Sequence, residues 1–235
     1  MDSIDHTIFI NLESRKDRLK HVTDELKKLG LSDDKFSRFP AIQLPNGRIG
    51  CSMSHLKCLQ IAKERRWKNV FVCEDDIEFT KPELLKEQSK KFFDNYSITG
   101  DKWDVCIVAG NNVPPYEKVD DYAIKVSHCQ TTTGYIVNEH YYDTLIENYK
   151  EGIQRLLKNP DHHVMFAIDK FWIQLQKRDK WFMIVPASVI QREDYSDIEK
   201  RNINYNWHML DIDKKEFLER QRKQQMQMNA MFARK

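Results

Sequence analysis

The segment that most constrains the fold is Asn69–Glu74 (NVFVCE), an apolar run that continues directly into two more carboxylates, Asp75 and Asp76. A strand with no polar face must be covered on both sides, which is typical of parallel sheets between two layers of helices. In such sheets, ligands bind beyond the carboxyl ends of the strands. The sequence therefore predicts an α/β sheet with a candidate site at the end of this strand.

The remaining chain alternates between strand patterns and helix patterns. Short apolar runs predict strands at 7–11, 36–42, 104–110, 122–127, 134–138 and 181–186. Helical spacing predicts one helix that stops at Gly30, and others over 51–66, 80–95, 139–157 and 169–176. This alternation predicts one α/β domain over residues 1–210, with a mixed sheet flanked by helices. Residues 211–235 form a basic, helix-prone tail, which we expect to pack on the domain or a second copy, or to bind an anionic surface.

Composition excludes several classes of function. Lys and Arg number 38 against 36 acidic residues, so a net charge of +2 offers no general affinity for nucleic acid or anionic lipid. No segment has the length and apolarity of a membrane span, and the N-terminal residues fit no signal peptide. Five cysteines without a CxxC pair predict reduced, packed thiols and a cytoplasmic protein.

The acidic triplet Glu74, Asp75 and Asp76 needs a partner if it is buried. Burying one unpaired carboxylate costs several kcal/mol or forces it to take up a proton. A divalent cation removes this conflict, and oxygen ligands favour Mg²⁺ or Mn²⁺ over Zn²⁺. The alternative is an exposed acidic turn, and the sequence leaves both readings open.

Four motifs occur in fixed order around the triplet. They are Phe9–Arg18 (FINLESRKDR), Gly47–His55 (GRIGCSMSH), Thr132–Tyr135 (TTGY) and Val189–Ile198 (VIQREDYSDI). In this order and at this spacing the chain resembles glycosyltransferase family 25, the group of lipooligosaccharide and procollagen galactosyltransferases. The resemblance extends from Ile8 to Ile198.

This resemblance implies a GT-A type transferase with a Rossmann-like mixed sheet that inverts the sugar carbon. It would use Mn²⁺ or Mg²⁺ to move a hexose, galactose first and glucose second, from a UDP-sugar. The acceptor would be a hydroxyl of a saccharide or of hydroxylysine in a collagen-like chain. A homodimer formed through the tail is a further expectation, and neither nucleic acid nor a membrane span is expected.

Site residues follow from the match to the family's motifs. Asp76 and Glu74 are expected to bind the metal. The residues expected to bind the nucleotide-sugar are Ile10, Asn11, Leu12, Arg15, Arg18, Gly50, Ser54, Glu74, Asp75, Thr132, Gly134 and Gln191. Gly50 and Ser54 are expected to bind because the free N–H groups at a helix start favour anions. Gly134 is expected to bind because a glycine lets a ligand approach the backbone closely.

Inversion also needs a base for the acceptor hydroxyl, and the candidates are Asp169, Asp194 and Asp197. Asp169 has an ordinary alternative, because it also suits a helix N-cap. Among the residues expected to bind the donor, Arg18 could instead be a solvated helix residue. His55 is either a structural histidine or a residue that positions the acidic loop.

Two other functions remain to be weighed. A metal-dependent phosphotransferase could use the same carboxylates, but the chain has no GxxxxGK[ST] loop. A non-catalytic module that binds a nucleotide-sugar or a protein would keep the triplet and lack the base.

Overall fold

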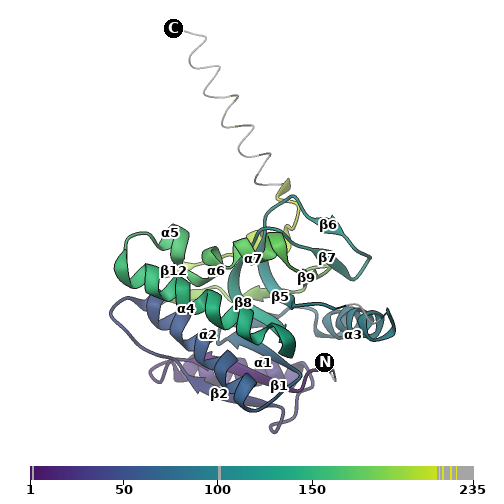
Figure 1. Ribbon diagram of the computed structural model, residues 1–235, viewed down its shortest axis with the longest axis horizontal. Helices are drawn as coiled ribbons and strands as arrows, with labels where there is room; N and C mark the ends of the chain where they lie inside the picture. The colour runs from purple at the N-terminus through teal and green to yellow at the C-terminus, as the bar shows by residue number, and fades with distance from the viewer. Residues whose placement is uncertain are drawn as a thin grey trace.

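The computed structural model describes residues 1, 3–99 and 102–215, and in the tail residues 217, 219, 223 and 226. An eight-stranded mixed sheet in the order β2-β1-β3-β8-β5-β9-β7-β6 forms the centre (Figure 1). Its strands are β1 (His6–Asn11), β2 (Phe36–Pro40), β3 (Asn69–Glu74), β5 (Val105–Asn112), β6 (Glu117–Lys118), β7 (Ala123–Lys125), β8 (Cys129–Asn138) and β9 (Trp181–Ile184). Two small antiparallel pairs join β4 (Ile77–Phe79) to β10 (Val189–Gln191), and β11 (Asp194–Ser196) to β12 (Arg201–Ile203).

Alternation of apolar side chains along the strands builds a core on each face of the sheet. In β1, Ile8 and Ile10 join one cluster, and Phe9 between them joins the other. In β3, Val72 and Cys73 separate in the same way. Because both faces are apolar, both are covered by helices.

The helices divide between the two faces. On one face α2 (Gly47–Glu64) packs beside α4 (Tyr142–Lys158), and both lie in front of the sheet in Figure 1. On the other face lie α1 (Lys16–Lys28) and α3 (Pro82–Thr99), whose buried side chains include Leu26 and Phe92. The shorter helices are η1 (Glu139–Tyr141), α5 (His163–Phe166), α6 (Ile168–Phe171), α7 (Ile173–Arg178) and α8 (Asn206–Leu210).

The predicted mixed α/β sheet with flanking helices is confirmed. β3 differs from the expectation in one respect, because it is parallel to β1 and antiparallel to β8. The apolar pattern of β3 indicates that both of its faces are buried. It does not indicate the direction of the neighbouring strands, so an antiparallel neighbour fits equally well. A second difference is that α2 begins at Gly47, four residues before the predicted start, with the side chain of Asn46 accepting a hydrogen bond from the backbone N–H of Arg48.

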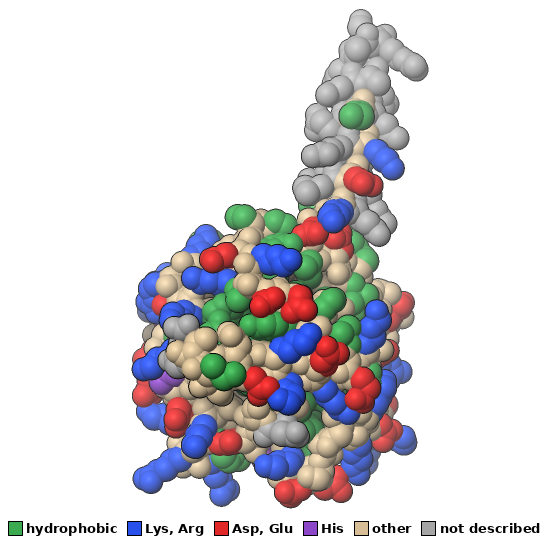
Figure 2. Space-filling model, turned by 90° about the vertical axis from the view of Figure 1, so that its right-hand side faces the viewer, with side chains coloured by type: hydrophobic (Ala, Val, Ile, Leu, Met, Phe, Trp, Pro, Cys, Tyr) green, Lys and Arg blue, Asp and Glu red, His purple; other side chains and the backbone are tan. Residues whose placement is uncertain are grey.

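All five cysteines are free, and all but Cys51 are buried, as expected for packed thiols. Within the described part of the chain, no helix is long and apolar enough to cross a membrane. Figure 2 shows basic and acidic side chains interspersed on one face of the described domain. The predicted helical tail from residue 211 lies largely outside the described residues.

Candidate active site

The acidic triplet lies where β3 ends and turns into β4. Asp75 and Asp76 are only 7% and 4% exposed, so the alternative of an exposed acidic turn is wrong. β1 pairs in parallel with β3, with Ile10 opposite Glu74. The end of β1 and the first turn of α1 therefore lie beside the triplet, as expected for the carboxyl edge of a sheet.

Arg18, in the first turn of α1, pairs with both aspartates. Its guanidinium is 3.0 Å from Asp75 Oδ1 and 2.9 Å from Asp76 Oδ2. Asn11, the last residue of β1, donates to Asp75 Oδ2 at 2.7 Å. Gln191 of β10 donates to Asp76 Oδ2 at 3.0 Å. Residues from the β1–α1 region and from β10 thus converge on the two aspartates.

The negative charges around Asp76 nevertheless exceed what Arg18 and Gln191 compensate. Its second oxygen, Oδ1, is buried and accepts no hydrogen bond from any described residue. Burial, with the charges of Glu74 and Asp75, raises the pKa of Asp76 to about 7 despite Arg18 and Gln191. Burial also raises the pKa of Asp75. An unpaired buried carboxylate oxygen beside a second carboxylate suits a hard divalent cation such as Mn²⁺ or Mg²⁺.

The segment after β10 is joined to α1 by a second set of ion pairs. Asp194 Oδ2 is 2.8 Å from Arg15 and 3.1 Å from Arg18. Arg15 also pairs with Asp197 at 2.9 Å, and both arginines donate to the backbone oxygen of Tyr195. Burial would raise the pKa of Asp194, but the backbone N–H of Tyr195 and the two arginines hold it below its ordinary value.

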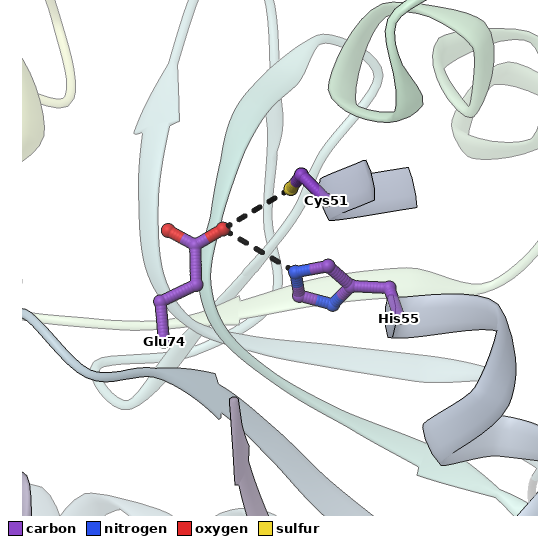
Figure 3. Close-up of side chains that lie close together, drawn as sticks. All are labelled: Cys51, His55 and Glu74. Carbon is purple, nitrogen blue, oxygen red and sulfur yellow. Dashed lines mark hydrogen bonds and ion pairs between the residues drawn. The ribbon is translucent and has the colours of Figure 1, made fainter. Parts of the chain in front are cut away.

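Glu74 faces the opposite side of the strand end, toward α2. Its Oε1 accepts a hydrogen bond from Thr132 at 2.6 Å, and lies 3.3 Å from His55 Nε2 and 3.8 Å from Cys51 Sγ (Figure 3). Burial would raise its pKa, but hydrogen bonds from His55 and Thr132 bring the pKa below its ordinary value. Figure 3 shows the second oxygen, Oε2, pointing away from Cys51.

His55 is completely buried and belongs to a longer chain of contacts. Its Nδ1 is 2.9 Å from the hydroxyl of Tyr135, which accepts a hydrogen bond from Tyr149 at 3.1 Å. His55 therefore connects Glu74 to the core beneath α4, which agrees with a positioning role for the acidic loop.

Asp169 lies on the α2 side, apart from the other two base candidates. Its Oδ2 accepts from the backbone N–H of Thr131 at 3.2 Å, and its charge contributes to the raised pKa of the Cys51 thiol. Thr131 has a φ of +70°, a strained value for a β-branched residue. Such strain commonly accompanies functional sites.

Gly50 and Ser54 both make contacts with other parts of the chain. Because α2 begins at Gly47, the N–H of Gly50 is not free and donates to Asn46 O at 3.2 Å. A Cβ at Gly50 would lie 2.2 Å from Ile42 O, so this glycine allows a close backbone crossing. Ser54 Oγ accepts from the N–H of Ile42 at 2.9 Å.

Gly134 also serves packing. A Cβ there would meet Ile77 at 2.9 Å and Phe71 at 3.2 Å, so the close approach involves core side chains of neighbouring strands. Its motif neighbour Thr132 does reach the triplet, through Glu74.

The remaining donor-site candidates lie near the end of β1. Ile10 belongs to the core, and Leu12 accepts from the backbone N–H of Arg15 at 3.0 Å. Sequence reasoning missed Arg38 of β2, which donates to Asn11 Oδ1 at 2.9 Å. It also missed Cys51, although this residue lies within a quoted motif and one helical turn before His55.

The sequence profile of glycosyltransferase family 25, described as an LPS biosynthesis protein family, matches residues 35–172. The match covers more than half of the chain and includes the triplet. No curated protein matches the chain in sequence.

Several solved structures share a distant likeness of overall arrangement. A197 from STIV has a TM-score of 0.44 and 10% identity, with 84% of this chain and 93% of that chain covered. Mannose-1-phosphate geranyltransferase from Thermus thermophilus has a TM-score of 0.44 and 8% identity, with 80% and 73% covered. A glycosyltransferase involved in the glycosylation of the major capsid of PBCV-1 has a TM-score of 0.41 and 9% identity, with 77% and 91% covered.

Proposed function

Because the chain belongs to glycosyltransferase family 25, we propose that it is an inverting, metal-dependent GT-A transferase that moves a hexose from a UDP-sugar to an acceptor hydroxyl. The proposed hexose is galactose, with glucose as the second choice, and the acceptor is a saccharide or a collagen-like hydroxylysine. The observation that carries the proposal is the buried pair Asp75 and Asp76 at the end of β3, where Arg18 leaves Asp76 Oδ1 unpaired.

Asp76 Oδ1 would hold Mn²⁺ or Mg²⁺ together with oxygens of the donor diphosphate. Glu74, which was also expected to bind this metal, faces α2. Asp76 Oδ1 is buried and has no hydrogen-bond partner among the described residues, so no partner would have to be displaced. The bound cation would neutralise charge on the leaving diphosphate. The donor set, all oxygen on this side, fits such a hard cation.

Arg15 and Arg18 would bind the diphosphate by exchanging some of their carboxylate partners for phosphate oxygens. Guanidinium groups form paired hydrogen bonds with either group, so this exchange preserves their geometry. Asp75 and Gln191 then hold the donor side of the site together, as they hold Arg18 and Asp76 here. The backbone of Ile10, Asn11 and Leu12 would receive the uridine.

Asp169 is the best placed of the three base candidates. Asp194 and Asp197 are both paired with Arg15, and the lowered pKa of Asp194 makes it a weaker base. Asp169 lies near Cys51 on the α2 side of the strand end, whereas Arg15 and Arg18 belong to the α1 side. Inversion requires the base and the leaving group on opposite faces of the sugar carbon, and the proposal assigns them to opposite sides of the strand end.

We extend the proposal to cell location and assembly. Five free cysteines support action in the cytoplasm. Homodimerisation would involve the basic tail, and size measurement after deletion of residues 216–235 tests it.

Calorimetric titration of UDP with and without Mn²⁺ tests the proposed function. Native protein should bind UDP more tightly with Mn²⁺, and Asp76→Asn should lose that gain. Asp143→Asn serves as a matched control, because Asp143 lies in the first turn of α4 at the opposite edge of the sheet and is exposed. If UDP fails to bind the native protein in either condition, the proposal is wrong. If UDP binds with Mn²⁺ but no UDP-hexose is consumed with any acceptor, the chain is instead a non-catalytic nucleotide-sugar module.

A further inference from the structure

The α2 side of the strand end gathers three different metal-ligand atoms. In the part of the chain that the structure describes, Cys51, His55 and Glu74 are the one group of three such residues with ligand atoms within 4.8 Å of one another. Figure 3 shows the thiol and imidazole of α2 converging on Glu74 Oε1. Cys51 and His55 are four residues apart, so a helix presents both on the same face.

The distances suit a small tetrahedral ion. Tetrahedral Zn²⁺ with ordinary bond lengths places N and O about 3.4 Å apart, and S and O about 3.6 Å apart. The corresponding distances to Glu74 Oε1 are 3.3 Å from His55 Nε2 and 3.8 Å from Cys51 Sγ. Without an ion, Cys51 and His55 form hydrogen bonds with Glu74 Oε1, and the bond from the Cys51 thiol is long.

The surroundings of His55 favour a metal-binding orientation. Tyr135 contacts Nδ1, which leaves Nε2 as the atom directed at Glu74. Metal-ligating histidines ordinarily have their other nitrogen held by such an outer partner. The site also has an entry path, since Cys51 is partly exposed and the side chain of Glu74 is 24% exposed.

We propose that Cys51 Sγ, His55 Nε2 and Glu74 Oε1 bind Zn²⁺ or a similar borderline-soft divalent ion, with a fourth position open beside Thr132. The ion takes the place of the thiol proton, which passes to solvent. Sulfur and imidazole donors distinguish this site from the all-oxygen site proposed for Mn²⁺ at Asp76. Three protein ligands with an open position are typical of zinc sites that exchange a water or another ligand.

Co²⁺ and Zn²⁺ binding to the full chain, without nucleotide, tests the site. Co²⁺ should produce a thiolate-to-metal charge-transfer band at one equivalent, and Cys51→Ser should abolish it. Cys58→Ala is the matched control, since Cys58 lies on the same helix, is fully buried and is outside the group. Zn²⁺ affinity, measured against a chelating dye, should fall at least about tenfold in Cys51→Ser and remain native in the control.

Asp76→Asn separates this proposal from the proposed transferase function. The charge-transfer band should persist in that variant, whether or not UDP binding is lost. Absence of the band in the native protein, or an undiminished band in Cys51→Ser, would overturn the proposal.

Discussion

Glu74 and Asp76 lie two residues apart, yet they belong to opposite sides of the strand end. Asp76 has an arginine as partner and still has a raised pKa, whereas Glu74 has His55 and Thr132 as partners and a lowered pKa. Asp76 is buried beside two further carboxylates, with one oxygen unpaired. Glu74 receives hydrogen bonds on one oxygen from Thr132 and His55. At Asp76, burial and like charges therefore outweigh the ion pair with Arg18, whereas at Glu74 the contacts with His55 and Thr132 help to outweigh burial.

The comparison also separates two kinds of chemistry. On the α1 side the groups are arginines and carboxylate oxygens, which suit a diphosphate and a hard cation. On the α2 side a thiol and an imidazole join one carboxylate oxygen, which suits a softer ion. One acidic triplet can serve both because the chain turns at Asp75, so that Glu74 and Asp76 point to different helices.

The largest expected loss of stability follows removal of the Arg18 guanidinium on the α1 side. Arg18→Ala leaves two buried aspartates without their charge partner, and removing one member of a buried pair costs about 3 kcal/mol or more. Urea denaturation at pH 7 measures the loss of unfolding free energy. Arg15→Ala is the control, with an expected loss of about 1 kcal/mol because Asp17 and Asp197, two of its partners, are largely exposed. Equal losses of unfolding free energy in the two variants would contradict the distinction between the buried ion pairs of Arg18 and the more exposed ion pairs of Arg15.

An intermediate effect is expected on the α2 side. His55→Leu keeps an apolar side chain in the core and leaves Tyr135 and Glu74 without one partner each, which should cost about 2 kcal/mol. The same urea denaturation applies, at low and at high salt. The loss should be independent of salt because His55 is completely buried. If His55→Leu lost more unfolding free energy than Arg18→Ala, the α2 side would contribute more stability than the α1 side, contrary to this prediction.

The smallest effect concerns Asp194, which joins β11 to both arginines. Its pKa lies below the ordinary value of 3.8, so the folded state favours the charged form. The resulting stability is present above pH 3.8 and is lost as the pH falls through the lowered pKa. Asp194→Asn should therefore lose about 1 kcal/mol at pH 7, and this loss should shrink as the pH falls through the lowered pKa of Asp194. A difference that persists at acid pH would show that the arginine pairs are not its source.

Much of the fold could be predicted because its signals are local. Asn69–Glu74 forms a strand with the predicted bounds, and the apolar spacing before Gly30 forms α1. The partner of β3 could not be read in this way, since β8 lies about 60 residues further along the chain and any strand with two apolar faces fits there. The short strand β10 was missed for a similar reason, because three residues carry too little periodicity.

For the site, the residue types indicated the chemistry and the tertiary structure decided the partners. The triplet at a strand end, with Arg18 following the first strand, was enough to predict a charged site at the carboxyl edge of the sheet. Which carboxylate meets an arginine and which meets a histidine depended on the turn at Asp75 and on the opposite placement of α1 and α2. Those contacts join segments that are far apart in the chain, and the local periodicity of the sequence does not predict them.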